Sequence, residues 1–243
     1  MYNVADTDKA LRPTVAGVGR PAVLELEYSS AGAFLVAYST NLATGGIFVE
    51  TAEPLPVGTA VTLRLQVPGA DKLEIEGQVV WGRPEGVGPG LPAGMGIEIL
   101  TPPDDYGVTI DRIAFGFSGI NILLGTGEPA PRAIFTRYLR SILTCEVADV
   151  DYEKSFDVLP TMIDLAIVDL DSSGVRGEEL IGHLRTRMGA HLPVVVLAQL
   201  ERDRVRAQEL GANDAVSNPP LFADLSATVV RCIGRPRNVR IVY

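Results

Sequence analysis

The chain has few of the residues from which disulfide scaffolds and most metal sites are built. Its 243 residues include two cysteines and two histidines. Cys145 and Cys232 are far apart and form no CxxC pair, which excludes a zinc ribbon and a redox dithiol. His183 and His191 each stand alone, without the cluster of ligands that a structural metal requires. We therefore predict reduced thiols and no metal site.

Basic residues and long apolar runs are also scarce. Lysine and arginine number 21 against 30 acidic residues, which gives a net charge of −9. This charge argues against a general binder of nucleic acid or of anionic membranes. No segment has about 18 uninterrupted apolar residues, and residues 1–20 lack the apolar core of a signal peptide. We expect a soluble cytoplasmic protein that does not insert into a membrane.

What the chain does contain indicates two folded domains. A hydrophobic content of 47% with 25 glycines and 17 prolines is typical of a globular, turn-rich protein. The period of the apolar residues changes near residue 119, so the halves are different folds rather than repeats. The predicted organisation is an N-terminal extension (1–18), a first domain (19–116), a linker (117–120), a second domain (121–235) and a C-terminal tail (236–243).

The first half alternates apolar and polar residues with a period of two. Val61, Leu63 and Leu65 share one face of a strand, and Thr62 and Arg64 share the other. Six such short strands, separated by turns rich in Gly and Pro, predict a small six-stranded antiparallel β-barrel followed by a helix. The strands are expected at residues 23–28, 34–38, 46–50, 61–67, 73–81 and 95–99, and the helix at about 102–115.

The stretch NLATGG at residues 41–46 leads directly into one of these strands. It resembles the (D/N)xSxxG loop of PilZ domains, which are bacterial six-stranded barrels that bind cyclic di-GMP. The phrases FLVAYSTNLATGGIFVET, PLPVGT and GMGIEIL are similar to a PilZ subfamily common in myxobacteria. The resemblance covers roughly residues 18 to 115.

The resemblance implies where a nucleotide would bind. Asn41, Gly45 and Gly46 match the loop that reads the guanine edge, while Ala43 occupies its serine position. PilZ domains also hold the ligand with an upstream RxxxR pair, and here Arg20 has no second arginine four residues away. We expect the ligand site to be impaired, and Gly45 and Gly46 to serve mainly as a tight turn.

The second half alternates strands and helices, which predicts an α/β doubly wound five-stranded parallel sheet. The strands are expected at 120–124, 145–150, 165–169, 193–198 and 214–217, and the helices at 131–143, 152–159, 178–188, 202–210 and 222–232.

The stretches DLAIVDLDSSGVRGEELIGHLR, LPVVVLAQ and ELGANDAVSNPP are similar to response-regulator receiver domains, with their flavodoxin-like fold, over about residues 119–235. The resemblance implies that Asp169 is the residue which would accept a phosphoryl group. The family's acid pair, switch hydroxyl, lysine and switch aromatic align with Thr126 and Gly127, Ala198, Asn218 and Ala215. Without these groups nothing offsets the charge of an acyl phosphate, so the resemblance favours a pseudo-receiver that binds a protein.

Receivers commonly pair through the face that here spans about 202–232. Candidate interaction residues are therefore Arg202, Arg206, Asn218 and Phe222, and the resemblance allows a homodimer through this domain.

Two enzyme interpretations fail because each motif lacks groups that its chemistry needs. GTGEPA at 125–130 fits the dinucleotide motif GxGxxA, but Pro129 and Pro131 remove the N–H donors that a pyrophosphate needs. Asp169 to Ser172 imitates the opening motif of haloacid-dehalogenase phosphatases, which also need a downstream lysine. After the first ten residues the only lysines are Lys72 and Lys154, both upstream.

Three functional hypotheses remain. The first is a non-enzymatic bacterial signalling adaptor that acts through protein–protein interaction and needs no cofactor. The second is a cyclic di-GMP effector whose receiver-like domain relays the signal. The third is a response regulator of a two-component system, phosphorylated on Asp169.

Overall fold

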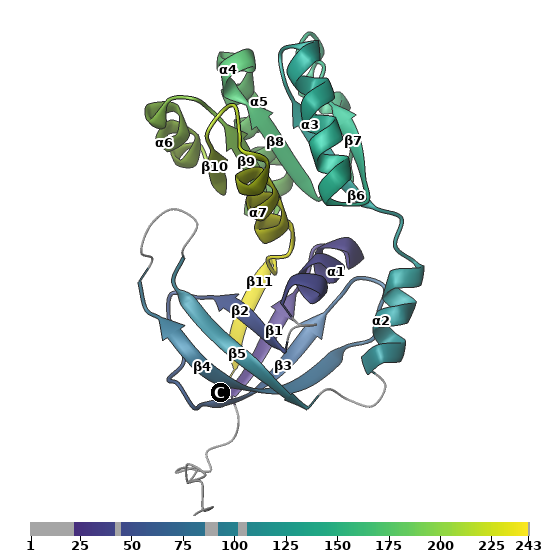
Figure 1. Cartoon of the computed structure of the whole chain (residues 1–243), viewed down its shortest axis with the longest axis vertical. Helices are drawn as coiled ribbons and strands as arrows, with labels where there is room; N and C mark the ends of the chain where they lie inside the picture. Colours follow the sequence, from purple (N-terminus) through teal and green to yellow (C-terminus); the bar gives the residue numbers. More distant parts are fainter. Residues whose placement is uncertain (1–21, 42–44, 86–91, 102–105, 243) are drawn as a thin grey trace, which may run out of the picture.

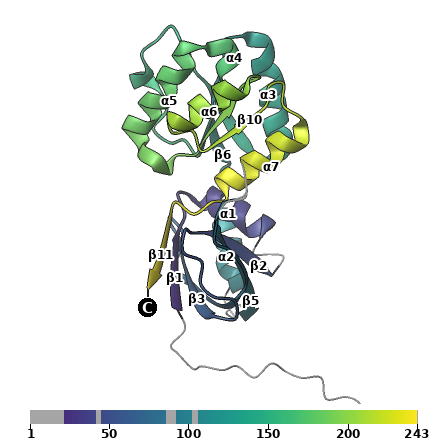
Figure 2. The ribbon, with the colours of Figure 1, turned by 90° about the vertical axis from the view of Figure 1, so that its left-hand side faces the viewer.

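Two sheets of different kinds lie at opposite ends of the molecule, with helix α1 between them (Figures 1 and 2). The computed structural model describes residues 22–41, 45–85, 92–101 and 106–242. A curled six-stranded sheet forms one domain, and a five-stranded parallel sheet flanked by helices forms the other. These architectures confirm the predicted fold class.

The first sheet has the strand order β11-β1-β3-β4-β5-β2. Alternate residues of its strands are buried, and in β3 these are the predicted Val61, Leu63 and Leu65. The elements of this domain are β1 (Ala22–Glu27), α1 (Ala31–Thr40), β2 (Gly46–Glu50), β3 (Ala60–Gln66), β4 (Leu73–Arg83), β5 (Gly94–Thr101), α2 (Tyr106–Phe115) and β11 (Asn238–Val242). The predicted start of α2 at 102–105 lies outside the described residues.

The prediction of a strand at residues 34–38 was wrong, because this segment lies in helix α1. Ser30 precedes the helix, and its Oγ accepts a hydrogen bond from the backbone N–H of Ala33 at 3.1 Å, as an N-cap residue does. The helix is apolar on most of its surface, since it packs against the sheet on one side and against the second domain on the other. An apolar run without a polar face has no helical period to read.

The helix also changes how the strands pair. Helix α1 carries the chain to β2, at the far edge of the sheet. The next strand, β3, then lies beside β1 and runs in the same direction, so that Leu24 pairs with Leu63 in a parallel ladder. The pairings among β2, β3, β4 and β5 are antiparallel, as predicted. The all-antiparallel prediction was therefore wrong at this one ladder.

The sixth strand comes from the C-terminus, so treating residues 236–243 as a tail was wrong. Strand β11 pairs antiparallel with β1, with Leu24 opposite Ile241 and Leu26 opposite Val239. The backbone N–H of Arg237 donates to the carbonyl oxygen of Glu27 at 2.7 Å, and their side chains form an ion pair. The first domain is thus completed by the last residues of the chain.

The second domain has the strand order β10-β9-β8-β6-β7 with all strands parallel. This is the flavodoxin-like order, in which the strand order reverses between β6 and β8. Its elements are β6 (Ile120–Gly125), α3 (Pro129–Ile142), β7 (Cys145–Asp149), η2 (Phe156–Val158), β8 (Leu165–Asp169), α4 (Leu170–Ser173), α5 (Val175–Met188), η3 (Gly189–His191), β9 (Val194–Leu197), α6 (Glu201–Glu209), β10 (Asp214–Val216) and α7 (Phe222–Ile233). The helix predicted at 152–159 is reduced to the single turn η2.

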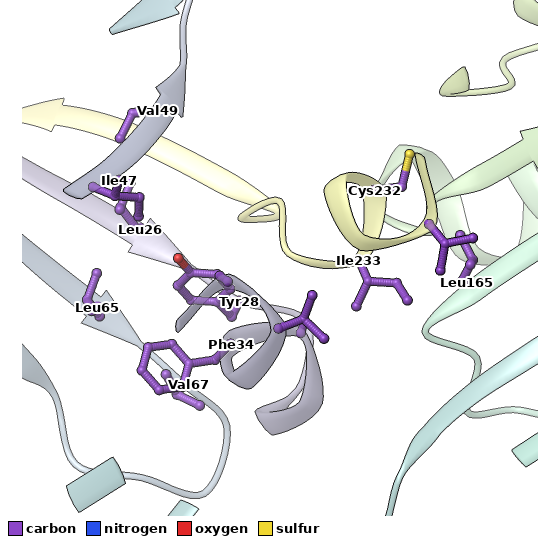
Figure 3. Packing of buried hydrophobic residues seen from close by; sticks show 14 of the residues in the cluster. Leu26, Tyr28, Phe34, Ile47, Val49, Leu65, Val67, Leu165, Cys232 and Ile233 are labelled. Carbon is purple, nitrogen blue, oxygen red and sulfur yellow. The ribbon is translucent and has the colours of Figure 1, made fainter. Parts of the chain in front are cut away.

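The two domains share one continuous hydrophobic core. Figure 3 shows α1 between the sheet residues Leu26 and Leu65 and the α7 residues Cys232 and Ile233, all of them buried. The same cluster continues into the second sheet through Leu165. The junction is therefore built like the interior of one domain, and the placement of the two sheets is set by packing.

Candidate functional site

Asp169 lies at the carboxyl end of β8, beside the point where the strand order reverses. Open α/β sheets bind ligands at this edge. The carboxyl group is nevertheless almost completely shielded, since Asp169 is 1% exposed. The candidate phosphoacceptor therefore has the position of a reactive group and the burial of a core residue.

Three donors occupy the carboxylate of Asp169. Its Oδ1 accepts from the backbone N–H of Asp171 at 3.2 Å and from Nδ2 of Asn218 at 3.0 Å. Its Oδ2 accepts from the hydroxyl of Ser172 at 2.7 Å. The Asn218 amide also donates to Asp171 at 2.8 Å, so one neutral side chain bridges two acids. The carboxylate is fixed by groups that carry no positive charge.

The helix α4 covers the edge of the sheet around Asp169. The backbone N–H of Gly127, in the loop after β6, donates to Ser172 Oγ at 2.9 Å. A Cβ atom at Gly127 would lie 2.2 Å from the carbonyl oxygen of Ser172, so only glycine allows this approach. Two loops that would have to open around a phosphoryl group are thus joined directly.

Burial raises the pKa of Asp169, and the negative charge of Asp171 acts in the same direction. The hydrogen bonds from Ser172 and Asp171 oppose this effect and lower the pKa. Because burial is the largest cause, the ionised form is less favourable here than in water.

The other residues aligned with receiver chemistry offer little to a phosphoryl group. Thr126 is buried and donates from Oγ1 to the carbonyl oxygen of Glu128 at 3.2 Å. Ala198 is buried and Ala215 is half-buried, and neither side chain can form a hydrogen bond. Of the aligned positions, only Asn218 reaches Asp169.

The predicted nucleotide loop follows the C-terminal end of α1, in the first domain. Asn41, Gly45 and Gly46 line one side of an open groove of about 500 Å³. Gly45 has a φ of +93°, as the predicted turn requires, and the N–H of Gly46 donates to the carbonyl oxygen of Asn41 at 3.3 Å. The structure brings these three residues together, whereas Arg20 and residues 42–44 lie outside the described part of the chain.

An aromatic pair that the sequence analysis missed lies in the same groove. The rings of Phe48 and Trp81 are stacked, with centroids 5.4 Å apart and planes inclined by 8°. Both residues pair with Gly96 across the sheet, and a Cβ atom there would lie 2.0 Å from Nε1 of Trp81. The guanidinium of Arg83 lies 5.4 Å from the Phe48 ring and 5.7 Å from the Trp81 ring. The sequence signal for this pair was the small residue Gly96, which leaves room between the large side chains Phe48 and Trp81 on the two neighbouring strands.

The predicted interaction face divides into free and covered parts. Arg202 and Arg206 are exposed on α6, and Phe222 is exposed at the start of α7, where its ring meets Tyr138 edge-on at 5.5 Å. The end of α7 is different, because it packs against α1 of the first domain. Asn218 belongs to the Asp169 network rather than to this face.

Among the described residues, no three His, Cys, Asp or Glu side chains are arranged to hold a metal ion. No described helix is both long enough and apolar enough to cross a membrane.

Part of the chain matches a known protein family. Residues 19–116 match the family described as PilZ domain. A search of curated proteins finds no match. The resemblance to a myxobacterial subfamily stays a prediction.

Solved receiver domains are similar to about half of the chain. A response regulator from Chloroflexus aurantiacus is 21% identical with a TM-score of 0.43, and the match covers 48% of this chain and 98% of that one. The receiver domain of a sensor histidine kinase from Pseudomonas aeruginosa, with a magnesium ion in its active-site cleft, is 24% identical with a TM-score of 0.43. That match covers 48% of this chain and 99% of the kinase domain. At these identities the likeness concerns the fold.

Proposed function

We propose that this protein is a non-enzymatic bacterial signalling adaptor whose receiver-like domain binds a protein partner and is not phosphorylated. The observation that carries this proposal is the closed environment of Asp169. Its oxygens accept from Asn218, Ser172 and the Asp171 backbone, and Ser172 is tied to the facing loop through Gly127. A phosphoryl group would have to displace these neutral donors and, among the described residues, would find neither a lysine bonded to Asp169 nor an acid cluster to hold a cation in return.

Exposed apolar side chains around the same edge support a role in binding. Val175, Leu200 and Leu221 follow β8, β9 and β10, and they are 73%, 45% and 70% exposed. The carboxyl ends of adjacent parallel strands meet at one edge of a sheet, so the segments that carry these residues leave the sheet at the same edge as Asp169. Apolar residues gathered on an exposed edge are typical of an interaction surface.

Acetyl phosphate with Mg²⁺, followed by intact-mass measurement, tests the proposal. We expect no phosphoryl adduct, under conditions in which an active receiver domain run in parallel is phosphorylated. An adduct on the wild-type chain that is absent from Asp169→Asn would overturn the adaptor function and support a response regulator.

A second candidate function, a cyclic di-GMP effector, is favoured by the aromatic pair in the groove. Trp81 is 44% exposed and lies beside the predicted loop residues Asn41 and Gly46. An exposed indole next to backbone amides offers a stacking surface for a base. Arg83 adds a cation beside this ring, in a sequence whose upstream RxxxR pair is incomplete.

A further inference from the structure

A second cavity lies between the two domains, next to the groove of the predicted nucleotide loop. It has a volume of about 310 Å³, within the range of small-molecule sites. Its first wall belongs to the curled sheet and the end of α1, and its second wall to α7 and the turn that follows. Asn41 and Phe48 line both the cavity and the groove, so the two spaces adjoin.

The cavity is lined by more positive than negative charge in a protein whose net charge is −9. Arg83 comes from β4, while Arg231 and Arg235 come from the end of α7 and the turn after it. Among the described residues of its lining the only acid is Glu50, which lies 2.9 Å from Nε of Arg235. Glu50 pairs with Arg235 and Asp214 pairs with Arg231, so among the described residues Arg83 brings the excess positive charge, which favours an anionic ligand.

Arg231 gives a further sign of an incomplete site. Its Nη2 is paired with Asp214 and with Thr228, but its Nε is buried and has no hydrogen-bond partner among the described residues. Buried donors without a partner are rare in native proteins, because an unmade hydrogen bond is unfavourable. This atom is shielded, so a phosphate in the cavity would meet Arg231 through the accessible part of its side chain, which is 34% exposed.

The arginines and the aromatic pair define the class of ligand. Arg83 joins the two features, since it lines the cavity and its guanidinium lies against the rings of Phe48 and Trp81. A ligand that uses both spaces needs a planar ring for the exposed indole and a phosphate for the guanidinium groups. Nucleotides combine these two groups.

We infer that the interdomain cavity is the phosphate subsite of a nucleotide-binding site to which the C-terminal domain contributes Arg231 and Arg235. The base lies on Trp81, and the phosphate lies between Arg83 and Arg235. This inference rests on the second candidate function and adds to it that binding requires both domains. The missing upstream arginine would then be replaced by cations from the opposite end of the chain.

Titration calorimetry of the full chain with cyclic di-GMP, GMP and inorganic phosphate tests the site. Arg235→Gln is expected to weaken nucleotide binding about tenfold or more, as loss of a charge-assisted contact does. Arg240→Gln, an exposed arginine of β11 outside the cavity lining, is the matched control and should leave binding unchanged. Glu50→Gln removes the carboxylate that competes for Arg235, and binding should tighten a few-fold.

The Glu50 variant separates a binding role from a structural one. If Arg235 only holds the domains together, Glu50→Gln would not improve binding and both variants would lower the unfolding temperature alike. Nucleotide binding that is unaffected by Arg235→Gln would overturn the subsite and leave the effector function in place. Absence of binding by either nucleotide would overturn both, and inorganic phosphate binding as tightly as the nucleotides would rule out a base on Trp81.

Discussion

Asp169 illustrates how a buried acid is held once charged partners are absent. In its network a neutral amide, a hydroxyl and a backbone N–H satisfy the carboxylate, and Asn218 spans Asp169 and Asp171. The hydrogen bonds compensate only part of the cost of burial, since the pKa of Asp169 is still raised. The arrangement favours rigidity over reactivity.

The raised pKa of Asp169 predicts how stability depends on pH. A group whose pKa is higher in the folded state than in the unfolded state stabilises the fold fully below its unfolded-state pKa. This stabilisation is lost as the pH rises through the folded-state pKa. Asp169→Asn cannot ionise, and its oxygen can keep the hydrogen bonds from Asp171 and Asn218. We expect its free energy of unfolding, relative to wild type, to increase in urea titrations as the pH rises above about 4, the ordinary pKa of an aspartate.

The exposed Asp224→Asn is the control for removing one negative charge. A relative stability of Asp169→Asn that falls with rising pH would mean that the folded protein favours the ionised carboxylate.

At the level of single residues, the sequence predicted the place of Asp169 but not its partners. The apolar run 165–168 puts the acid at the end of a buried strand, and family resemblance identifies Thr126, Ala198 and Asn218 as the aligned positions. The hydrogen bond of Ser172 depends on the turn α4, and four residues carry no hydrophobic period from which a turn could be read.

At the level of elements, the largest departure from the sequence prediction is that one predicted strand is helical and that a C-terminal strand takes its place in the sheet. Residues 34–38 form part of α1, and β11 takes the sixth place in the sheet. The residues of β11 alternate, with Val239 and Ile241 facing the core and Arg240 exposed, so its strand character was readable. Its partner was not, because pairing β11 with β1 requires the whole second domain to fold between them.

Strand β11 should be necessary for the stability of the first domain. Ile241 is partly buried against the core, whereas Val242 is 44% exposed on the same strand. We expect Ile241→Ala to lower the free energy of unfolding by about 1–3 kcal/mol and Val242→Ala by at most about 0.5 kcal/mol, measured by urea titration. Equal effects would show that the strand contributes only through its backbone.

For the whole molecule, the continuous core predicts that the domains unfold together. At Gly32, helix α1 lies very close to the start of the second domain. A Cβ atom there would lie 2.5 Å from Cδ1 of Ile120 and 2.8 Å from Cε2 of Phe117. On the other side of α1, a Cβ atom at Gly234 would lie 3.2 Å from the backbone nitrogen of Ala37. Domains that meet through glycine at two points cannot shift without losing buried apolar contacts.

Calorimetric unfolding of a matched pair of helix variants tests this coupling. Gly32→Leu and Gly182→Leu both replace a helical glycine by a strong helix former, but nothing lies within 4 Å of a Cβ atom at Gly182. We expect wild type and Gly182→Leu to unfold in one transition, the latter up to about 1 kcal/mol more stable. Gly32→Leu should be destabilised by about 1–3 kcal/mol and should separate into two transitions, because overpacking the junction uncouples the two sheets. A single transition of unchanged midpoint in Gly32→Leu would mean that the domains are joined by their connecting segments and not by the shared core.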